Sequence, residues 1–414
     1  MLLESPVKFL SVNSSPEIEV LLICACTSME SEKANRLKAL LQAGIEWEKL
    51  IQMATQHKVI PLLYWNLNTI CPEAVPQNIF DRLQKNYYTD ARRNLFLSGE
   101  LVRLLDLFES QGIQALPFKG PILAASAYGN LSLRQFCDLD ILIREKDIEK
   151  AKMLFLSEGY EMKIERIEVT PEQEAAFVRS PNIHHFVREA AYPFIHEQKK
   201  ILAELHWGIV PKYFSFPLDS EQLWENIEQV SIAGKSVPNL SPENALLMIC
   251  GHGTKDCWRQ LARICDVAEI IRSHPQLDWT KLMERATILG GKRMLCLGIF
   301  LAKNLLGTTL PDSVCQKIQA DPEVEILATQ VFDGLFSNTN KSSKDGNVTS
   351  FHLRAKENLT DKLQYFLLIT ITPTTTDWLL LPLAKFPTFI YYLLRPIRLI
   401  GEQALKVFKS MVAM

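Results

Sequence analysis

The hydrophobic pattern of the chain changes character twice, and this limits the folds that it can form. Between residues 32 and 107 glycine is scarce and apolar residues recur every three or four positions, as in amphipathic helices. From about residue 112 to 208 the apolar runs are short or alternating and are separated by Gly, Pro and Asn. Helical periodicity returns after about residue 221. We therefore predict an α+β fold, with a small mixed sheet embedded in a larger, mainly helical body.

The same pattern divides the chain into five regions. An N-terminal helical region is expected over 1–110, an α/β core over 111–210 and a helical domain over 211–336. Residues 337–350 are polar, small and turn-rich, which predicts a loop. Residues 351–414 are expected to form a helical, apolar C-terminal segment.

Within the core, strands and helices are expected to alternate. The predicted strands cover 114–118, 136–143, 159–167, 184–189 and 201–207. The predicted helices cover 121–128 and 147–157, with Asp147 as the N-cap of the second.

The composition excludes several classes of protein. Of the 414 residues, 47% are apolar and 22% charged, so extended disorder is excluded. Lys and Arg number 45 against 47 Asp and Glu, and without a basic excess a nucleic-acid partner is not expected. The nine cysteines are odd in number and include no CxxC pair, which favours reduced thiols and a cytoplasmic location. The spacing of Cys250, His252 and Cys257 matches no standard zinc site.

The most membrane-like stretch covers residues 378–394. It is interrupted by Pro382, Lys385 and Pro387 and is shorter than the roughly 20 apolar residues of a membrane span. We expect two short helices packed on a core. Peripheral membrane contact, helped by Arg395 and Arg398, is the alternative.

Two ten-residue segments resemble each other. Residues 45–54 and 277–286 both begin with an apolar residue, an acid and Trp, and both have Lys, Leu and Ala at the same later positions. Either both are helices that play the same packing role, or two amphipathic helices are alike by chance.

The acidic strand is the first feature that suggests chemistry. Side chains alternate along a strand, so Asp138 and Asp140 share one face while Leu139 and Ile141 share the other. Two neighbouring carboxylates repel unless a cation lies between them, and Mg²⁺ (or Mn²⁺) prefers oxygen ligands. A solvated acidic strand end is the alternative.

A strand-to-helix turn precedes the acidic strand. Glycine at such a turn, here Gly120, lets backbone amides approach a phosphate, and Lys119 could add a positive charge. Arg134 could bind phosphate or hold the acidic strand in place. Tyr128 is expected to be a packing residue.

A third acid is available on a later strand. Glu204 and His206 alternate onto one face of the strand over 201–207. Glu204 could complete a metal site or be an exposed edge-strand acid, and His206 could be functional or structural.

At these residues the chain resembles a bacterial group of uncharacterised nucleotidyltransferases within the DNA polymerase β-like superfamily. The matching positions are Lys119-Gly120, Tyr128, Arg134, Asp138-Leu-Asp140 and Glu204-Leu-His206-Trp207. A downstream helix beginning at His252, with Asp266 beyond it, and the pair Asp278-Trp279 are also similar. The resemblance covers most of residues 35–310.

The resemblance implies a polymerase β-like core and metal-dependent transfer of a nucleotidyl group. The donor would be a nucleoside triphosphate, expected to be ATP, and the acceptor a hydroxyl of a small molecule or protein. Asp138, Asp140 and Glu204 would be the catalytic metal ligands. A module of the same fold that binds a nucleotide or partner without catalysis is the alternative.

The nucleotide would be held by a second set of residues: Lys119, Gly120, Arg134, His206, His252 and Lys255. The Lys-Gly pair departs from the usual Gly-Ser or Gly-Gly motif of the superfamily, which leaves the choice of base open. We further expect Asp140→Asn to abolish transfer while stability holds or rises, because the substitution removes one of two like charges.

Overall fold

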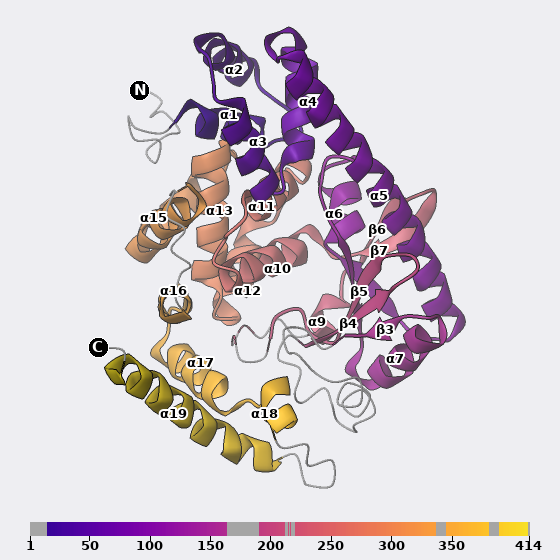
Figure 1. Ribbon diagram of the computed structural model, residues 1–414, viewed down its shortest axis with the longest axis vertical. Coiled ribbons are helices and arrows are strands. Elements are labelled where there is room, and N and C mark those ends of the chain that lie inside the picture. Colours follow the sequence, from indigo (N-terminus) through magenta and orange to yellow (C-terminus); the bar gives the residue numbers. More distant parts are fainter. Residues whose placement is uncertain are drawn as a thin grey trace.

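The computed structural model describes residues 15–163, 190–211, 214, 216, 220–336, 345–380 and 389–412. A small mixed sheet lies between helices from the N-terminal part of the chain and helices from its later part (Figure 1). The α+β fold predicted from the sequence is therefore confirmed.

The sheet has five strands in the order β1-β2-β5-β4-β3. Only β2 and β5 pair in parallel; the other neighbours are antiparallel. The strands are β1 (Ala115–Phe118), β2 (Asp138–Ile143), β3 (Glu161–Met162), β4 (Ala191–His196) and β5 (Ile201–His206). The helices between them are α6 (Gly120–Ser126) and α7 (Ile148–Ser157), the second preceded by a 3-10 turn at Glu145–Asp147.

The two faces of the sheet have different surroundings. Leu139 and Ile141 of β2 and Leu205 of β5 are fully buried in a hydrophobic cluster with residues of α5 (Gln77–Ser110) and α7. The side chains at alternate positions, including Asp140 and Glu204, lie on the opposite face. The opposite face also packs through Leu142 and Phe118 against the largest hydrophobic cluster, and the acidic residues lie beside this packing.

Strand β4 was not predicted, because it contains Pro193. The carbonyl of Pro193 accepts a hydrogen bond from the Lys163 amide at 2.9 Å. In an antiparallel strand the N and O of one residue point to the same side, so the missing N–H faces the short β3 side and the ladder with β5 stays complete. The strand predicted at 184–189 lies outside the described residues.

The N-terminal helices form a bundle that is tied to the rest of the chain by buried polar contacts. Within the bundle, Asn66 donates hydrogen bonds to the carbonyls of Cys24 and Cys26. The tie to the later part of the chain is Glu269, which accepts bonds from the amide and hydroxyl of Thr27. These helices are α1 (Pro16–Cys24), α2 (Ser31–Ala43), α3 (Trp47–Gln56), α4 (Ile60–Ile70) and α5, with a 3-10 turn at Pro72–Ala74. Helices that precede the sheet in the sequence and helices that follow it therefore pack into one helical body.

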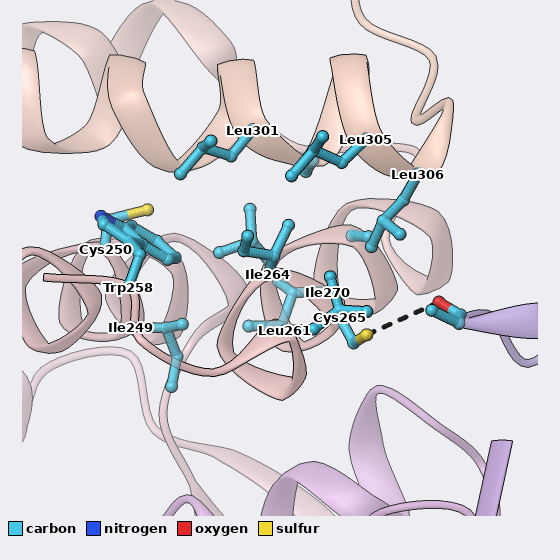
Figure 2. Packing of buried hydrophobic residues seen from close by; sticks show 14 of the residues in the cluster. Ile249, Cys250, Trp258, Leu261, Ile264, Cys265, Ile270, Leu301, Leu305 and Leu306 are labelled. Carbon is cyan, nitrogen blue, oxygen red and sulfur yellow. Dashed lines mark hydrogen bonds between the residues drawn. The ribbon is translucent and has the colours of Figure 1, made fainter. Parts of the chain in front are cut away.

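The later helices surround the largest hydrophobic cluster (Figure 2). Trp258 is fully buried there, next to Cys250. The helices are α10 (Pro242–Lys255), α11 (Leu261–Ser273), α12 (Trp279–Ile288), α13 (Lys292–Leu306), α14 (Asp312–Gln319) and α15 (Pro322–Phe336). Before them lie α9 (Ser220–Leu223) and a separate hairpin of β6 (Glu228–Ile232) and β7 (Lys235–Asn239).

The two similar segments play matching roles. Each forms a ten-residue helix that begins at its tryptophan, α3 at Trp47 and α12 at Trp279. Both tryptophans are half-buried against the large cluster, and Leu50 and Leu282 are fully buried. The two helices therefore pack in a similar way, but the tryptophans, which we expected to be buried, each keep part of the side chain exposed.

The C-terminal helices are α16 (Asp345–Ala355), α17 (Leu359–Ile371), α18 (Thr375–Leu380) and α19 (Phe389–Val412). Helix α16 begins inside the range 337–350 that we predicted as a loop, and residues 337–344 lie outside the described part. Within the described ranges, no helix combines the length and the hydropathy that a membrane crossing requires.

The tight packing around Trp258 gives a test of the fold. A Cβ added at Gly298 of α13 would overlap Cys250 Sγ and lie 2.9 Å from the Trp258 ring. We expect Gly298→Ala to lower the free energy of unfolding by about 1–3 kcal/mol, because the core is already full. Denaturant titration followed by circular dichroism measures the change.

The matched control is Gly99→Ala in α5, where an added Cβ meets nothing within 4 Å. There the loss of backbone freedom in the unfolded chain should stabilise the protein by about 0.5–1 kcal/mol. Equal effects of the two substitutions would contradict the packing described here.

Candidate active site

The acidic residues come together because β2 and β5 are parallel neighbours. Asp140 is the direct partner of Glu204 in the ladder, and Asp138 lies two residues earlier on the same face. Asp140 is 5% exposed, whereas the Glu204 side chain is 27% exposed. The pair therefore has one buried carboxylate and one that solvent can reach.

His206 lies between these two carboxylates. Its Nε2 is 3.1 Å from Asp140 Oδ1 and 3.1 Å from Glu204 Oε2. The ring of Phe118 packs edge-on against the imidazole, with 4.9 Å between centroids. Asp140, Glu204 and His206 each offer a ligand atom within 4.8 Å of the others, which is close enough for all three to bind one metal ion.

Lys119 places a positive charge beside Asp140. Its Nζ lies 3.3 Å from Asp140 Oδ1 and 5.0 Å from the centre of the Phe118 ring. The side chain reaches this position from a strained backbone, with φ 59° and ψ −142°. Gly120 follows with φ 34°, and a Cβ there would lie 3.3 Å from the carbonyl oxygen of Asp138. The Lys-Gly turn is therefore pressed directly against the start of the acidic strand.

The two aspartates differ in their electrostatics. Burial alone would raise the pKa of Asp140, but Lys119 and then the His206 hydrogen bond hold that pKa well below its usual range. Burial and the charge of Asp140 instead raise the pKa of Asp138. For His206, burial favours the neutral ring, yet the bonds to Asp140 and Glu204 raise its pKa. The negative charge of Asp140 is thus stabilised by Lys119 and His206, whereas that of Asp138 is destabilised by burial and by the charge of Asp140.

Helices α10 and α11 bring further residues toward the acids. Burial, followed by the charges of Lys119, Lys255 and Arg263, lowers the pKa of His252 well below its usual value. His252 is 5% exposed, and its Nε2 has no hydrogen-bond partner among the described residues. Lys255 ends α10 and lies 3.7 Å from Asp256 Oδ1. Arg263 is near enough to help lower the pKa of Asp140.

Arg134 has a different surrounding from the one that phosphate binding requires. Its Nε and Nη2 donate to Asp266 Oδ1 and Oδ2 at 2.7 and 2.9 Å, and the pair is buried. The Tyr128 hydroxyl donates to the same carboxylate at 2.8 Å. Because both of these nitrogens already donate to a carboxylate, they cannot also bind a phosphate as a bidentate pair. Of the two roles considered for Arg134, the geometry therefore favours the structural one.

Sequence reasoning selected most of these residues but grouped them differently. The possible metal group includes His206, which we had expected to bind nucleotide, and does not include Asp138. Asp266 and Arg263 had not been given roles. No pattern in the sequence pairs Asp266 with Arg134, 132 positions away, or shows that Arg263 lies near Asp140. Cys250 and Cys257 form no metal-ligand group with His252 within the described ranges, and none of the nine cysteines forms a disulfide.

Comparison with known proteins gives one match. A family model described as "Uncharacterised nucleotidyltransferase" matches residues 43–307, which is more than half of the chain and includes every residue of the site. No curated protein and no solved structure matches. The chain therefore belongs to the uncharacterised nucleotidyltransferase family, which confirms the family named in the resemblance noted from the sequence.

The contrast between the aspartates corrects our expectation for the stability of Asp140→Asn. Asparagine would leave Lys119 without its buried counter-charge and His206 with only Glu204. We expect a loss of about 2–3 kcal/mol in the metal-free protein. Asp138→Asn instead removes a carboxylate that its neighbours repel, so stability should hold or rise by up to about 1 kcal/mol.

Thermal melting of both variants in chelator-treated buffer at neutral pH measures this difference. The order of stability should be Asp138→Asn at or above wild type, with Asp140→Asn clearly below. If Asp140→Asn melts at or above the wild-type temperature, Lys119 and His206 do not compensate Asp140.

Proposed function

We propose that this nucleotidyltransferase-family protein transfers a nucleoside monophosphate, expected to be AMP, from a nucleoside triphosphate to a hydroxyl of a small molecule or protein. The observation that carries the proposal is the meeting of Asp140, Glu204 and His206 on two parallel strands beside the Lys119-Gly120 turn. This arrangement offers ligands for a cation and positive charge for a phosphate within one site.

The residues present suit divalent metal ions. Asp140 and Glu204 offer carboxylate oxygens, which Mg²⁺ prefers, and the imidazole nitrogen of His206 also suits Mn²⁺. Asp138 adds a third carboxylate on the same face. A bound pair of such ions would neutralise charge on the attacking oxygen and on the leaving pyrophosphate.

In the proposed reaction the acceptor oxygen attacks the α-phosphorus, the new P–O bond forms and the bond to pyrophosphate breaks. The acceptor proton must leave at the same time, and Glu204 is the residue proposed to receive it. Glu204 is the more exposed of the two paired carboxylates, so an acceptor arriving from solvent can reach it. Asp140, held deep in the site, is better suited to positioning.

The triphosphate is proposed to bind among the cations that surround the acids. Lys119 contacts Asp140 in the structure. With a metal ion bound at the Asp140 carboxylate, the ammonium group of Lys119 would be able to pair with a phosphate instead. Lys255 and Arg263 add positive charge near His252, and both approach Asp256, at 3.7 and 3.8 Å. The unsatisfied Nε2 of His252 is available to a donor or acceptor group of the nucleotide.

Incubation of the purified chain with each α-labelled nucleoside triphosphate, Mg²⁺ or Mn²⁺ and a cell extract tests the proposal. We expect metal-dependent label on an acceptor, strongest with ATP. Asp140→Asn should reduce the rate by about a thousandfold or more, because several kcal/mol of charge stabilisation are lost.

Asp333→Asn on α15 is the matched control, since it makes the same change at an exposed position away from the site. Its transfer rate should equal that of wild type. Binding of labelled nucleotide without transfer under every condition would instead favour a catalytically idle module. An active Asp140→Asn protein would exclude the proposed site.

A further inference from the structure

Two C-terminal helices carry an unusual amount of exposed apolar surface. Of the fifteen large hydrophobic residues exposed on the described part of the chain, nine lie on α17 and α19. Leu363, Phe366 and Leu367 of α17 are 55–61% exposed, and Leu393, Ile397 and Ile400 of α19 are 65–71% exposed. Figure 1 shows these helices side by side along one margin of the molecule. We call this surface the C-terminal apolar face.

The inner side of α17 fixes its orientation. Tyr365 is buried, and its hydroxyl lies 2.9 Å from His352 Nδ1. The Tyr365 ring also packs edge-on against Phe214, with 6.4 Å between centroids. Leu363 and Leu367 lie on the opposite side of the helix from Tyr365 and Phe366 lies on its flank, and all three are exposed.

Helix α19 is oriented by its charges. Arg395 is 4% exposed and donates to Asp377 Oδ2 at 3.0 Å, while Arg398 donates to Asp377 Oδ1 at 2.6 Å. The charged side of the helix is thus turned toward the protein, and Leu393, Ile397 and Ile400 face outward. An ordinary surface helix has the reverse arrangement.

We propose that the C-terminal apolar face binds the surface of an anionic lipid bilayer. An interfacial helix lies with its apolar side in the acyl boundary and its polar side away from it, which is the orientation of α19. Residues 375–414 contain five Lys or Arg and two Asp or Glu, whereas the whole chain has a formal charge of −2. Arg395 and Arg398 are balanced by Asp377 and Glu402, so the excess positive charge of the segment is that of its three lysines, Lys385, Lys406 and Lys409. This local excess of positive charge complements an anionic leaflet.

The charge also argues against a second copy of the chain as the occupant. Two copies that meet through the same face would bring two positively charged segments together. An anionic bilayer satisfies both the apolar surface and the positive charge. The proposal does not depend on the transfer activity, because its test measures binding alone.

Flotation of the full chain with vesicles tests the proposal. Binding to phosphatidylcholine vesicles that contain phosphatidylglycerol should exceed binding to pure phosphatidylcholine by at least about tenfold and should fall with added salt. A variant with Leu393, Ile397 and Ile400 all changed to Ser should lose more than about a hundredfold in partitioning, because three apolar side chains no longer enter the bilayer.

The matched control changes Leu95, Ile288 and Ile326 to Ser, which removes the same residue types from exposed positions elsewhere. Its partitioning should equal that of wild type. Absence of vesicle binding by wild type, or equal loss in both variants, would overturn the proposal. So would a wild-type dimer that the α19 variant alone converts to monomer, since a second copy would then cover the face.

Discussion

The buried ion pair between Arg134 and Asp266 determines how the sheet meets the helical body. Both side chains are nearly inaccessible, so neither charge could remain buried without the other. The same guanidinium reaches the carbonyl of Gly120 at 3.4 Å, and Tyr128 donates to the same carboxylate. One interaction therefore joins the segment before β2, the start of α6 and helix α11. The position of the candidate site between the sheet and α10–α11 depends on it.

That dependence explains which features of the fold could be predicted. Hydrophobic periodicity indicated the helical regions and strands β1, β2 and β5, because local pattern and final structure agree there. Strand β4 was missed because Pro193 is tolerated only when its absent N–H faces away from the main ladder, and that direction is set by pairing with β5. The structural role of Arg134 was likewise one of two alternatives, because its partner lies 132 residues away.

In the candidate site, too, features set within one strand could be predicted, whereas features set by contacts between distant parts of the chain could not. Alternation along each strand correctly placed Asp138 and Asp140 on one face of their strand, and Glu204 and His206 on one face of theirs. It could not give the register between β2 and β5, which sets Asp140 opposite Glu204 and brings His206 Nε2 within 3.1 Å of both. The register between strands decides which ligand atoms meet, so no pattern within one strand could group His206 with Asp140 and Glu204.

The difference between the two aspartates follows from position alone. In the sequence, Asp138 and Asp140 are equivalent members of one motif, but only Asp140 lies at the level of Lys119 and His206. A buried carboxylate needs a nearby positive charge, which Lys119 supplies, while His206 adds a hydrogen bond. A divalent ion would then exchange with charges already present rather than enter an uncompensated acidic site. The Lys119 backbone, at φ 59° and ψ −142°, places the ammonium group 3.3 Å from Asp140 Oδ1.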